Sequence, residues 1–335
     1  MKSYLFVFSD IFHEFKIPEL KALFDLYGVH EAMVKQEFIF SNRTMVLELE
    51  SEVPVRQVLG RSLLIKEAFE LWAEANTYSE LFDQLRLVAH NYSQYFGRDQ
   101  SFAVRVHGLG RKRSTGYAVD KIERLSFLPF EGAVDLKSPC NTFHFIECFE
   151  SETLKSVGGK RREESGEDEV PPSHVYFGRL IGRGQQELPH KYNLQQRRYI
   201  GNTTMDPQLA LIQANLVKLD RSSFVYDPFA GTGGILLAAA HFGAMCIGSE
   251  INYNILYGIG RSSRSSEKYL KDDQNVLANF EQYQLTGRCA GVLLADAGHP
   301  QFLRRCQLFD AILTDRKCVF CRSHNFTWNA GSFAP

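Results

Sequence analysis

Two spacings of hydrophobic residues recur along the chain. Apolar residues at every second position predict half-buried strands, as in residues 101–107. Apolar residues three or four positions apart predict amphipathic helices, as in residues 77–95, where Thr77 is a suitable N-cap and Gly97 lies just past the end. Strands and helices therefore alternate along the chain, and their order predicts three domains and a tail.

Residues 1–72 predict a small α+β domain. Strands are expected at 3–8, 38–40 and 45–49, with the last two forming a hairpin, and helices at 17–27 and 53–60. This order is typical of a ferredoxin-like fold. Such a domain can act as a scaffold or take part in chemistry, and both interpretations stay open.

Residues 73–184 predict a second α+β domain, with strands at 101–107, 143–149 and 175–180 and helices at 77–95 and 117–127. It contains the densest basic zone of the chain. The basic residues are Arg105, Arg111, Lys112, Arg113, Lys121 and Arg124. Such a zone is typical either of a solvated surface or of contact with RNA phosphates, and neither is excluded. Residues 156–172, which are glycine-rich and charged, predict a mobile surface loop.

Residues 185–315 predict an α/β domain organised around a glycine-rich turn. A short buried strand is expected at 224–226 and a helix at 235–240, with Gly231 and Gly233 between them. Further helices are expected at 252–262 and 273–283, and a further strand at 309–314. These glycines allow a tight turn and bring backbone N–H groups close to a ligand at the start of the helix. Strand, glycine loop and helix together are typical of the start of a nucleotide-binding unit.

Four predicted strands of this domain are followed by a carboxylate: Asp227, Glu250, Asp296 and Asp315. The carboxyl ends of parallel strands meet at one edge of a sheet, where ligands of open α/β sheets bind. Glu250 has the spacing of an acidic residue that accepts hydrogen bonds from both hydroxyls of a ribose. Leu236 replaces the third glycine of the dinucleotide fingerprint, and no G-K-S/T follows. A nucleoside with a small tail is therefore favoured, and a nicotinamide-dependent oxidoreductase is a disfavoured alternative.

Composition narrows the class of protein. The 335 residues are 44% hydrophobic and 23% charged, which is typical of a soluble globular chain with two or three domains. The net charge of -1 excludes a uniformly basic nucleic-acid binder, so any RNA binding must come from a local patch. No signal peptide or membrane span is expected. Seven scattered cysteines favour reduced thiols in a cytoplasmic protein.

Three motifs resemble those of class I S-adenosylmethionine-dependent methyltransferases. They are D-P-F-A-G-T-G-G at 227–234, R-R-Y-I-G-N-T-T-M-D at 197–206 and L-L-A-D-A around Asp296, and they occur together with Glu250. More narrowly, they resemble the family that methylates the N2 amine of guanosine at position 10 of tRNA. That family has a ferredoxin-like domain and a THUMP RNA-binding domain ahead of a Rossmann-like methyltransferase domain, which is the predicted order.

The resemblance implies S-adenosylmethionine as the cofactor and tRNA as a partner. The implied cofactor-binding residues are Asp227 for the ammonium group, Gly231 and Gly233 for the methionine end, Glu250 for the ribose, Asp296 for the adenine amine, and Asn202 and Thr203 as a cover. Phe229, in the same loop, is also implied to bind the cofactor. The six basic residues named above would contact tRNA by shape and phosphates. The resemblance also implies a small zinc-binding activator protein as a partner, and no membrane.

The resemblance implies Asp315 as the catalytic residue, because family members carry an Asp-Pro-Pro-Tyr turn that holds the target base. Here Asp315 is followed by Arg316, Lys317 and Cys318. We expect residues 316–335 to be a divergent tail, and the predicted sheet to lack its last strands. A tRNA methyltransferase with little activity and a non-catalytic form that binds tRNA or the activator are the two leading hypotheses.

A zinc site in the tail is a further, disfavoured alternative. Cys318, Cys321 and His324 supply three ligands, whereas a structural zinc site needs four. No metal site is predicted.

Overall fold

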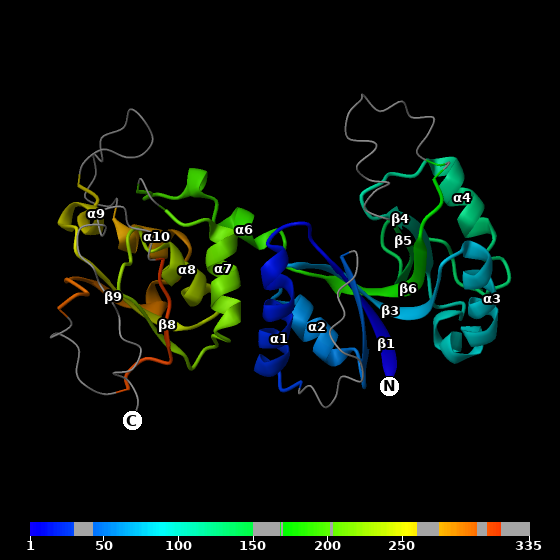
Figure 1. Ribbon diagram of the computed structural model, residues 1–335, viewed down its shortest axis with the longest axis horizontal. Helices are drawn as coiled ribbons and strands as arrows, with labels where there is room; N and C mark the ends of the chain where they lie inside the picture. Colours follow the sequence, from blue (N-terminus) through cyan, green and yellow to red (C-terminus); the bar gives the residue numbers. More distant parts are fainter. Residues whose placement is uncertain are drawn as a thin grey trace. The chain divides into compact units, whose positions relative to one another are not determined.

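A computed structural model describes residues 1–29, 43–149, 168, 170–201, 204–259, 275–299 and 307–315. The chain forms two compact units, Met1–Gln185 and Gln186–Pro335 (Figure 1). Of the predicted elements, the strand at 38–40 and most of the loop at 156–172 lie outside the described residues. None of the described helices is long and apolar enough to cross a membrane.

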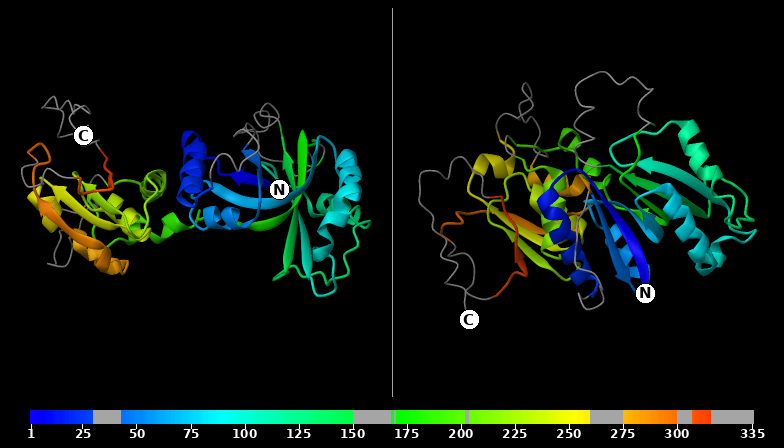
Figure 2. Two further views of the ribbon diagram at one scale, coloured as in Figure 1. Left: turned by 90° about the horizontal axis from the view of Figure 1, so that it is seen from below. Right: turned by 45° about the vertical axis from the view of Figure 1, so that its right-hand side comes forward.

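The first unit is built on one six-stranded sheet with the order β2-β1-β3-β6-β5-β4. Its strands are β1 (Lys2–Phe8), β2 (Thr44–Leu49), β3 (Ile65–Ala75), β4 (Phe102–Gly108), β5 (Asn141–Cys148) and β6 (His174–Arg183). Neighbouring strands are antiparallel except β4 and β5, which are parallel. The sheet is twisted, so that β1 and β5 run in clearly different directions (Figure 2). Because β3 continues through residue 72, one sheet spans the predicted boundary, and the division at 72 stays a prediction.

The predicted helices of this unit are present as α1 (Lys16–Leu26), α2 (Val53–Leu59), α3 (Tyr78–Val88) and α4 (Thr115–Glu123), with short 3-10 helices at His13–Phe15 and Ala89–Tyr95. Thr77 is the N-cap of α3, as predicted, and its side chain accepts a hydrogen bond from the backbone of Glu80. The prediction of one α-helix over 77–95 is wrong beyond Val88. The chain kinks there, and the ring of Tyr92 stacks on Trp72 with 4.1 Å between centroids.

Two hydrophobic cores lie on the same face of this sheet. One joins β1 and β2 to α1 and α2, and the other joins β5 and β6 to α3. The strand register places Tyr4, Glu70, Arg179 and Phe143 in one row across β1, β3, β6 and β5, so all four side chains belong to that face. Tyr4 belongs to the first core and Phe143 to the second. The charged pair Glu70–Arg179 therefore lies between the cores.

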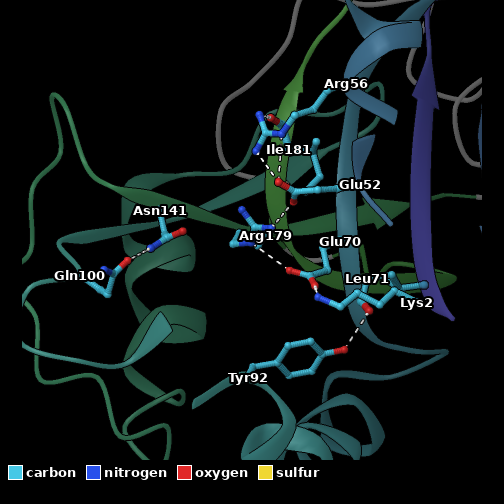
Figure 3. Close-up of polar contacts among 10 residues, drawn as sticks. All are labelled: Lys2, Glu52, Arg56, Glu70, Leu71, Tyr92, Gln100, Asn141, Arg179 and Ile181. Carbon is cyan, nitrogen blue, oxygen red and sulfur yellow. Dashed lines mark hydrogen bonds and ion pairs between the residues drawn. The ribbon is translucent and has the colours of Figure 1, made fainter. Parts of the chain in front are cut away.

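That pair is part of a buried ionic cluster (Figure 3). The guanidinium of Arg179 donates to Glu70 at 2.9 Å and to Glu52 at 2.7 Å, and it lies over the ring of Tyr95. Lys2 donates to the other carboxylate oxygen of Glu70 at 2.6 Å. Because each buried charge has a hydrogen-bonded partner, the cluster links the two cores without leaving an unpaired charge.

The second unit contains a parallel four-stranded sheet with the order β10-β7-β8-β9. Its strands are β7 (Phe224–Asp227), β8 (Met245–Glu250), β9 (Cys289–Leu294) and β10 (Ala311–Ile312). The helices are α6 (Leu188–Lys191), α7 (Pro207–Leu216), α8 (Gly234–His241), α9 (Tyr253–Tyr257) and α10 (Val276–Gln282), with 3-10 turns at Leu194–Gln196 and Thr286–Arg288. This alternation of parallel strands and helices is the α/β architecture predicted for a Rossmann-like domain.

Two predicted elements of this unit are shorter in the structure. The helix expected over 252–262 ends at Tyr257, because Gly258 adopts a left-handed conformation with φ +66° and caps it; residues 260–262 lie outside the described chain. The strand expected over 309–314 pairs with β7 only at Ala311 and Ile312. Phe309, the first residue of the expected strand, instead stacks on the ring of Tyr226 with 5.0 Å between centroids.

Candidate functional site

The loop between β7 and α8 has the backbone conformation that its glycines permit. Gly231 and Gly233 have φ of +52° and +81°, in the left-handed region that most residues avoid. Gly233 is the N-cap of α8, and the side chain of Asp227 accepts a hydrogen bond of 3.0 Å from the backbone N–H of Phe229. The loop therefore places backbone N–H groups and the start of a helix at the carboxyl end of β7, where an anion is favoured.

Replacing Gly233 with Ala is expected to lower the free energy of unfolding of the second unit by about 1–3 kcal/mol. An added Cβ would lie 2.7 Å from Cγ1 of Val276, at a backbone angle that favours glycine. Urea unfolding measures the effect. Gly287→Ala is the matched control, because a Cβ there meets nothing within 4 Å and its φ is not positive; equal effects of the two substitutions would contradict the prediction.

Glu250 lies at the end of β8 and is joined to this loop. One oxygen of its carboxylate accepts a hydrogen bond from the N–H of Gly231 at 2.9 Å, and the other accepts from the N–H of Asn252, also at 2.9 Å. Each oxygen retains a second lone pair for a ligand hydroxyl. The next side chain, Ile251, is 65% exposed and presents an apolar surface beside the carboxylate.

The carboxylates of Glu250 and Asp315 both lie near that of Asp227. Burial raises the pKa of the Asp227 carboxyl to about 7, the nearby negative charges of Glu250 and Asp315 act in the same direction, and the N–H of Phe229 opposes them. The structure therefore brings three of the four predicted carboxylates together. Asp315 is exposed at the end of the segment that carries β10.

Asp296, the fourth carboxylate, follows β9 and is partly exposed. Its two oxygens are engaged locally, one with the N–H of Gly298 at 2.8 Å and the other with Nδ1 of His299 at 2.9 Å. The backbone N–H of Ala295 donates to the carbonyl of Glu250 at 3.1 Å, so this turn lies beside the end of β8.

The segment before the sheet is fixed against the glycine loop. Asn279 of α10, fully buried, accepts from the N–H of Tyr199 at 3.0 Å and donates to its carbonyl at 2.8 Å. The hydroxyls of Thr204 and Thr232 lie 3.0 Å apart, and Thr204 also accepts from the N–H of Gly201 at 3.3 Å. Asn202 and Thr203 lie outside the described residues. Asn279 has no sequence signal beyond its place in a predicted helix, and it was missed for that reason.

Comparison with known proteins identifies two domain families in the chain. Residues 2–186 match the family described as Tmrp11 THUMP N-terminal domain, and residues 195–288 match the RMKL-like methyltransferase domain. The chain is 35% identical over 316 residues to the tRNA (guanine(10)-N(2))-methyltransferase TRMT11 of Xenopus laevis, covering 94% of this chain and 63% of that protein. The chain belongs to the THUMP-containing tRNA (guanine(10)-N2)-methyltransferase family. The resemblance inferred from the motifs is confirmed.

The chain aligns with only part of the length of its relatives. The tRNA (guanine(10)-N(2))-methyltransferase TRMT11 of Homo sapiens is 34% identical over 316 residues, covering 94% of this chain and 65% of that protein. This family member thus spans less than two thirds of the length of the Xenopus and human relatives. The crystal structure of TrmN from Thermus thermophilus matches with 17% identity and a TM-score of 0.44, covering 93% of this chain and 78% of that one.

In this methyltransferase family member, the six predicted RNA-binding residues are in different environments. Arg105, Lys112 and Arg124 are exposed. Arg111 lies over the ring of Phe149, and Lys121 is mostly covered, with its ammonium group 2.8 Å from Asp120. The side chain of Arg113 is almost fully buried and donates to Glu147 at 2.6 Å. The contacts of Arg113 are those of a structural residue, and RNA contact by the zone as a whole stays a prediction.

Proposed function

We propose that this chain binds S-adenosylmethionine at the carboxyl edge of its parallel sheet and acts on the N2 amine of guanosine 10 in tRNA. The observation that carries the proposal is the cluster of Asp227, Glu250 and Asp315 around the Gly231–Gly233 loop. The substrate comes from the relatives, whose names describe tRNA (guanine(10)-N(2))-methyltransferases.

The residues present fit such a cofactor. The carboxylate of Glu250 has lone pairs for the ribose hydroxyls, and Ile251 offers an apolar surface to the adenine ring. Asp227 would receive the ammonium group, and the loop amides lie where a carboxylate is favoured. Asp296 would accept from the adenine amine if its turn opens toward the ligand. When bound, the cofactor supplies an activated methyl group.

Asp315 would position the acceptor. Its exposed carboxylate can accept hydrogen bonds from an exocyclic amine and hold the nitrogen in line with the methyl group at roughly 3–3.5 Å. The same carboxylate can receive the proton that the amine loses after transfer. The residues that follow, Arg316, Lys317 and Cys318, do not provide the ring that would stack on the base. This favours a second candidate, a form that binds tRNA or its partner with little turnover.

The two proposed partners use different units. Exposed basic residues of the first unit, Arg105, Lys112 and Arg124, support binding of tRNA phosphates. On the second unit, Tyr253 and Tyr257 of α9 are about half exposed, and their rings lie 4.6 Å apart. This apolar surface supports the proposed activator, which would cover it.

Donor binding and methyl transfer can be tested in one series. S-Adenosylhomocysteine is expected to raise the unfolding midpoint of the chain, because a ligand that binds only the folded state stabilises it.

Transfer of labelled methyl groups to tRNA, with the activator present, is expected to be near background. The combined substitution Arg316→Pro, Lys317→Pro and Cys318→Tyr should increase it, with Asp315→Ala in that background as the control. No stabilisation by S-adenosylhomocysteine would contradict the donor site; strong transfer by the unchanged chain would contradict the second candidate.

A further inference from the structure

Arg197 is a buried cation that forms no ion pair with a carboxylate among the described residues. Its residue is only 2% exposed, and its Nε and Nη1 atoms have no hydrogen-bond acceptor among the described residues. Burial lowers the pKa of the guanidinium, and Tyr283, Tyr192 and Asp206 offset the lost hydration only in part. The buried guanidiniums of Arg113 and Arg179, by contrast, donate to carboxylates at 2.6 and 2.9 Å.

The guanidinium of Arg197 lies at the start of α8. Its Nη1 atom is 3.4 Å from the position that a Cβ on Gly234, the first residue of α8, would occupy. The first-turn amides of a helix have no acceptor within the helix and carry partial positive charge. A buried cation beside a positive helix end is unfavourable by itself. An anion bound at the start of α8 would accept hydrogen bonds from the guanidinium of Arg197 and from the first-turn amides of the helix.

The segment that carries Arg197 is held in place on both sides. The carbonyl of Gln196 accepts from Gln282 of α10 at 2.8 Å, and Tyr199 makes the two hydrogen bonds to Asn279 described above. Arg197 therefore cannot readily leave the site to find water. Its position is fixed before any ligand arrives, which favours selective binding over loose attraction.

We propose that Arg197 binds the carboxylate at the methionine end of S-adenosylmethionine, an inference that rests on the donor site proposed above. The amino-acid end of that ligand carries one negative and one positive group. Arg197 lies at the start of α8, and Asp227 at the end of β7, on the two sides of the glycine loop. Two buried groups of opposite charge thus match the two charges of the ligand, the carboxylate at Arg197 and the ammonium group at Asp227.

The test compares two ligands that differ only in the carboxylate. S-Adenosylhomocysteine and its decarboxylated analogue are titrated calorimetrically against the wild-type chain and Arg197→Met. Wild type should prefer the carboxylate ligand at least tenfold, since a charge-assisted hydrogen bond contributes this much. Arg197→Met should lose that preference while its affinity for the analogue changes little. The variant without ligand should unfold at the same or a higher temperature, because a buried unpaired charge has been removed.

Arg198→Met is the matched control. This neighbouring arginine is half exposed and lies 3.7 Å from Glu281, so its removal should leave the ligand preference unchanged. Arg197→Lys keeps the charge but not the planar guanidinium, so it should retain a reduced preference for the ligand with the carboxylate. It replaces Arg197→Met in the test if that variant does not fold. A full preference in both Arg197 variants, or an equal loss of affinity for both ligands, would overturn the proposal. Failure of wild type to bind either ligand would instead overturn the donor site itself.

Discussion

Glu147→Gln is expected to destabilise the first unit by about 3–5 kcal/mol, the largest effect on stability that we predict. Glu147 is fully buried in β5. One oxygen of its carboxylate accepts from the hydroxyls of Tyr78 and Tyr117, at 2.6 and 2.7 Å, and the other accepts from Nε of Arg113 at 2.6 Å. Glutamine keeps the shape of the side chain but leaves Arg113 as a buried charge without a counter-ion.

Urea unfolding followed by the fluorescence of Trp72 measures the change. This residue lies in the core of the first unit, and Trp328→Phe removes the other tryptophan from the signal. Glu131→Gln is the control, because Glu131 pairs with Arg98 on the surface at 3.1 Å and both side chains are mostly exposed. Its loss should cost less than about 1 kcal/mol. If Glu147→Gln were as stable as wild type, the ion pair between Glu147 and Arg113 would not stabilise the fold. Arg113 would then again be a candidate for RNA contact.

The contacts of Glu147 explain why sequence alone assigned Arg113 to the surface. A run of three basic residues usually faces solvent, and nothing local distinguishes Arg113 from Lys112. Its partner lies 34 positions away in another strand. The same holds for Arg197 and Arg198, which are adjacent in the sequence but differ completely in burial. Patterns identify residue types and periods, whereas long-range pairing decides which charge is buried.

The glycine loop was predictable because its information is local. The strand 224–226, the turn glycines and the helix after them are contiguous, and each residue type is needed for its own backbone conformation. The lengths of β10 and α9 were not predictable to the same degree. They depend on the ring of Phe309 meeting Tyr226 and on the left-handed cap at Gly258, a residue that a helix can also accommodate.

Asp227→Asn is expected to weaken binding of S-adenosylhomocysteine at least tenfold at pH 8, if Asp227 receives the ligand's ammonium group as proposed. Asparagine can still accept from the N–H of Phe229, so the loop keeps its shape while the negative charge is lost. The wild-type affinity should fall as the pH drops through about 7, where the free carboxyl becomes protonated. The variant should not show this dependence. Calorimetric titration between pH 6 and pH 8 compares the two chains.

Without ligand, the same substitution should stabilise the chain. Burial raises the pKa of Asp227 from 3.8 in the reference state to about 7 in the folded state, so the folded chain binds this proton more tightly than the unfolded chain. The stability that the protonated group contributes is complete below pH 3.8 and is lost as the pH rises through 7. Asparagine has no such loss, so the advantage of the variant should grow over that interval, on the order of 4 kcal/mol at most.

Glu281→Gln makes the same change of charge at an exposed position of α10 and should leave both ligand affinity and the pH dependence unchanged. Parallel stability curves for wild type and Asp227→Asn would show that the Asp227 carboxyl is not perturbed. A stabilised variant that binds S-adenosylhomocysteine as tightly as wild type would separate the two properties, because Asp227 would then be buried for packing and the ammonium group would bind elsewhere. If Asp227→Asn is more stable than wild type and also binds S-adenosylhomocysteine more weakly, the Asp227 carboxylate reduces stability but is needed to bind the ligand.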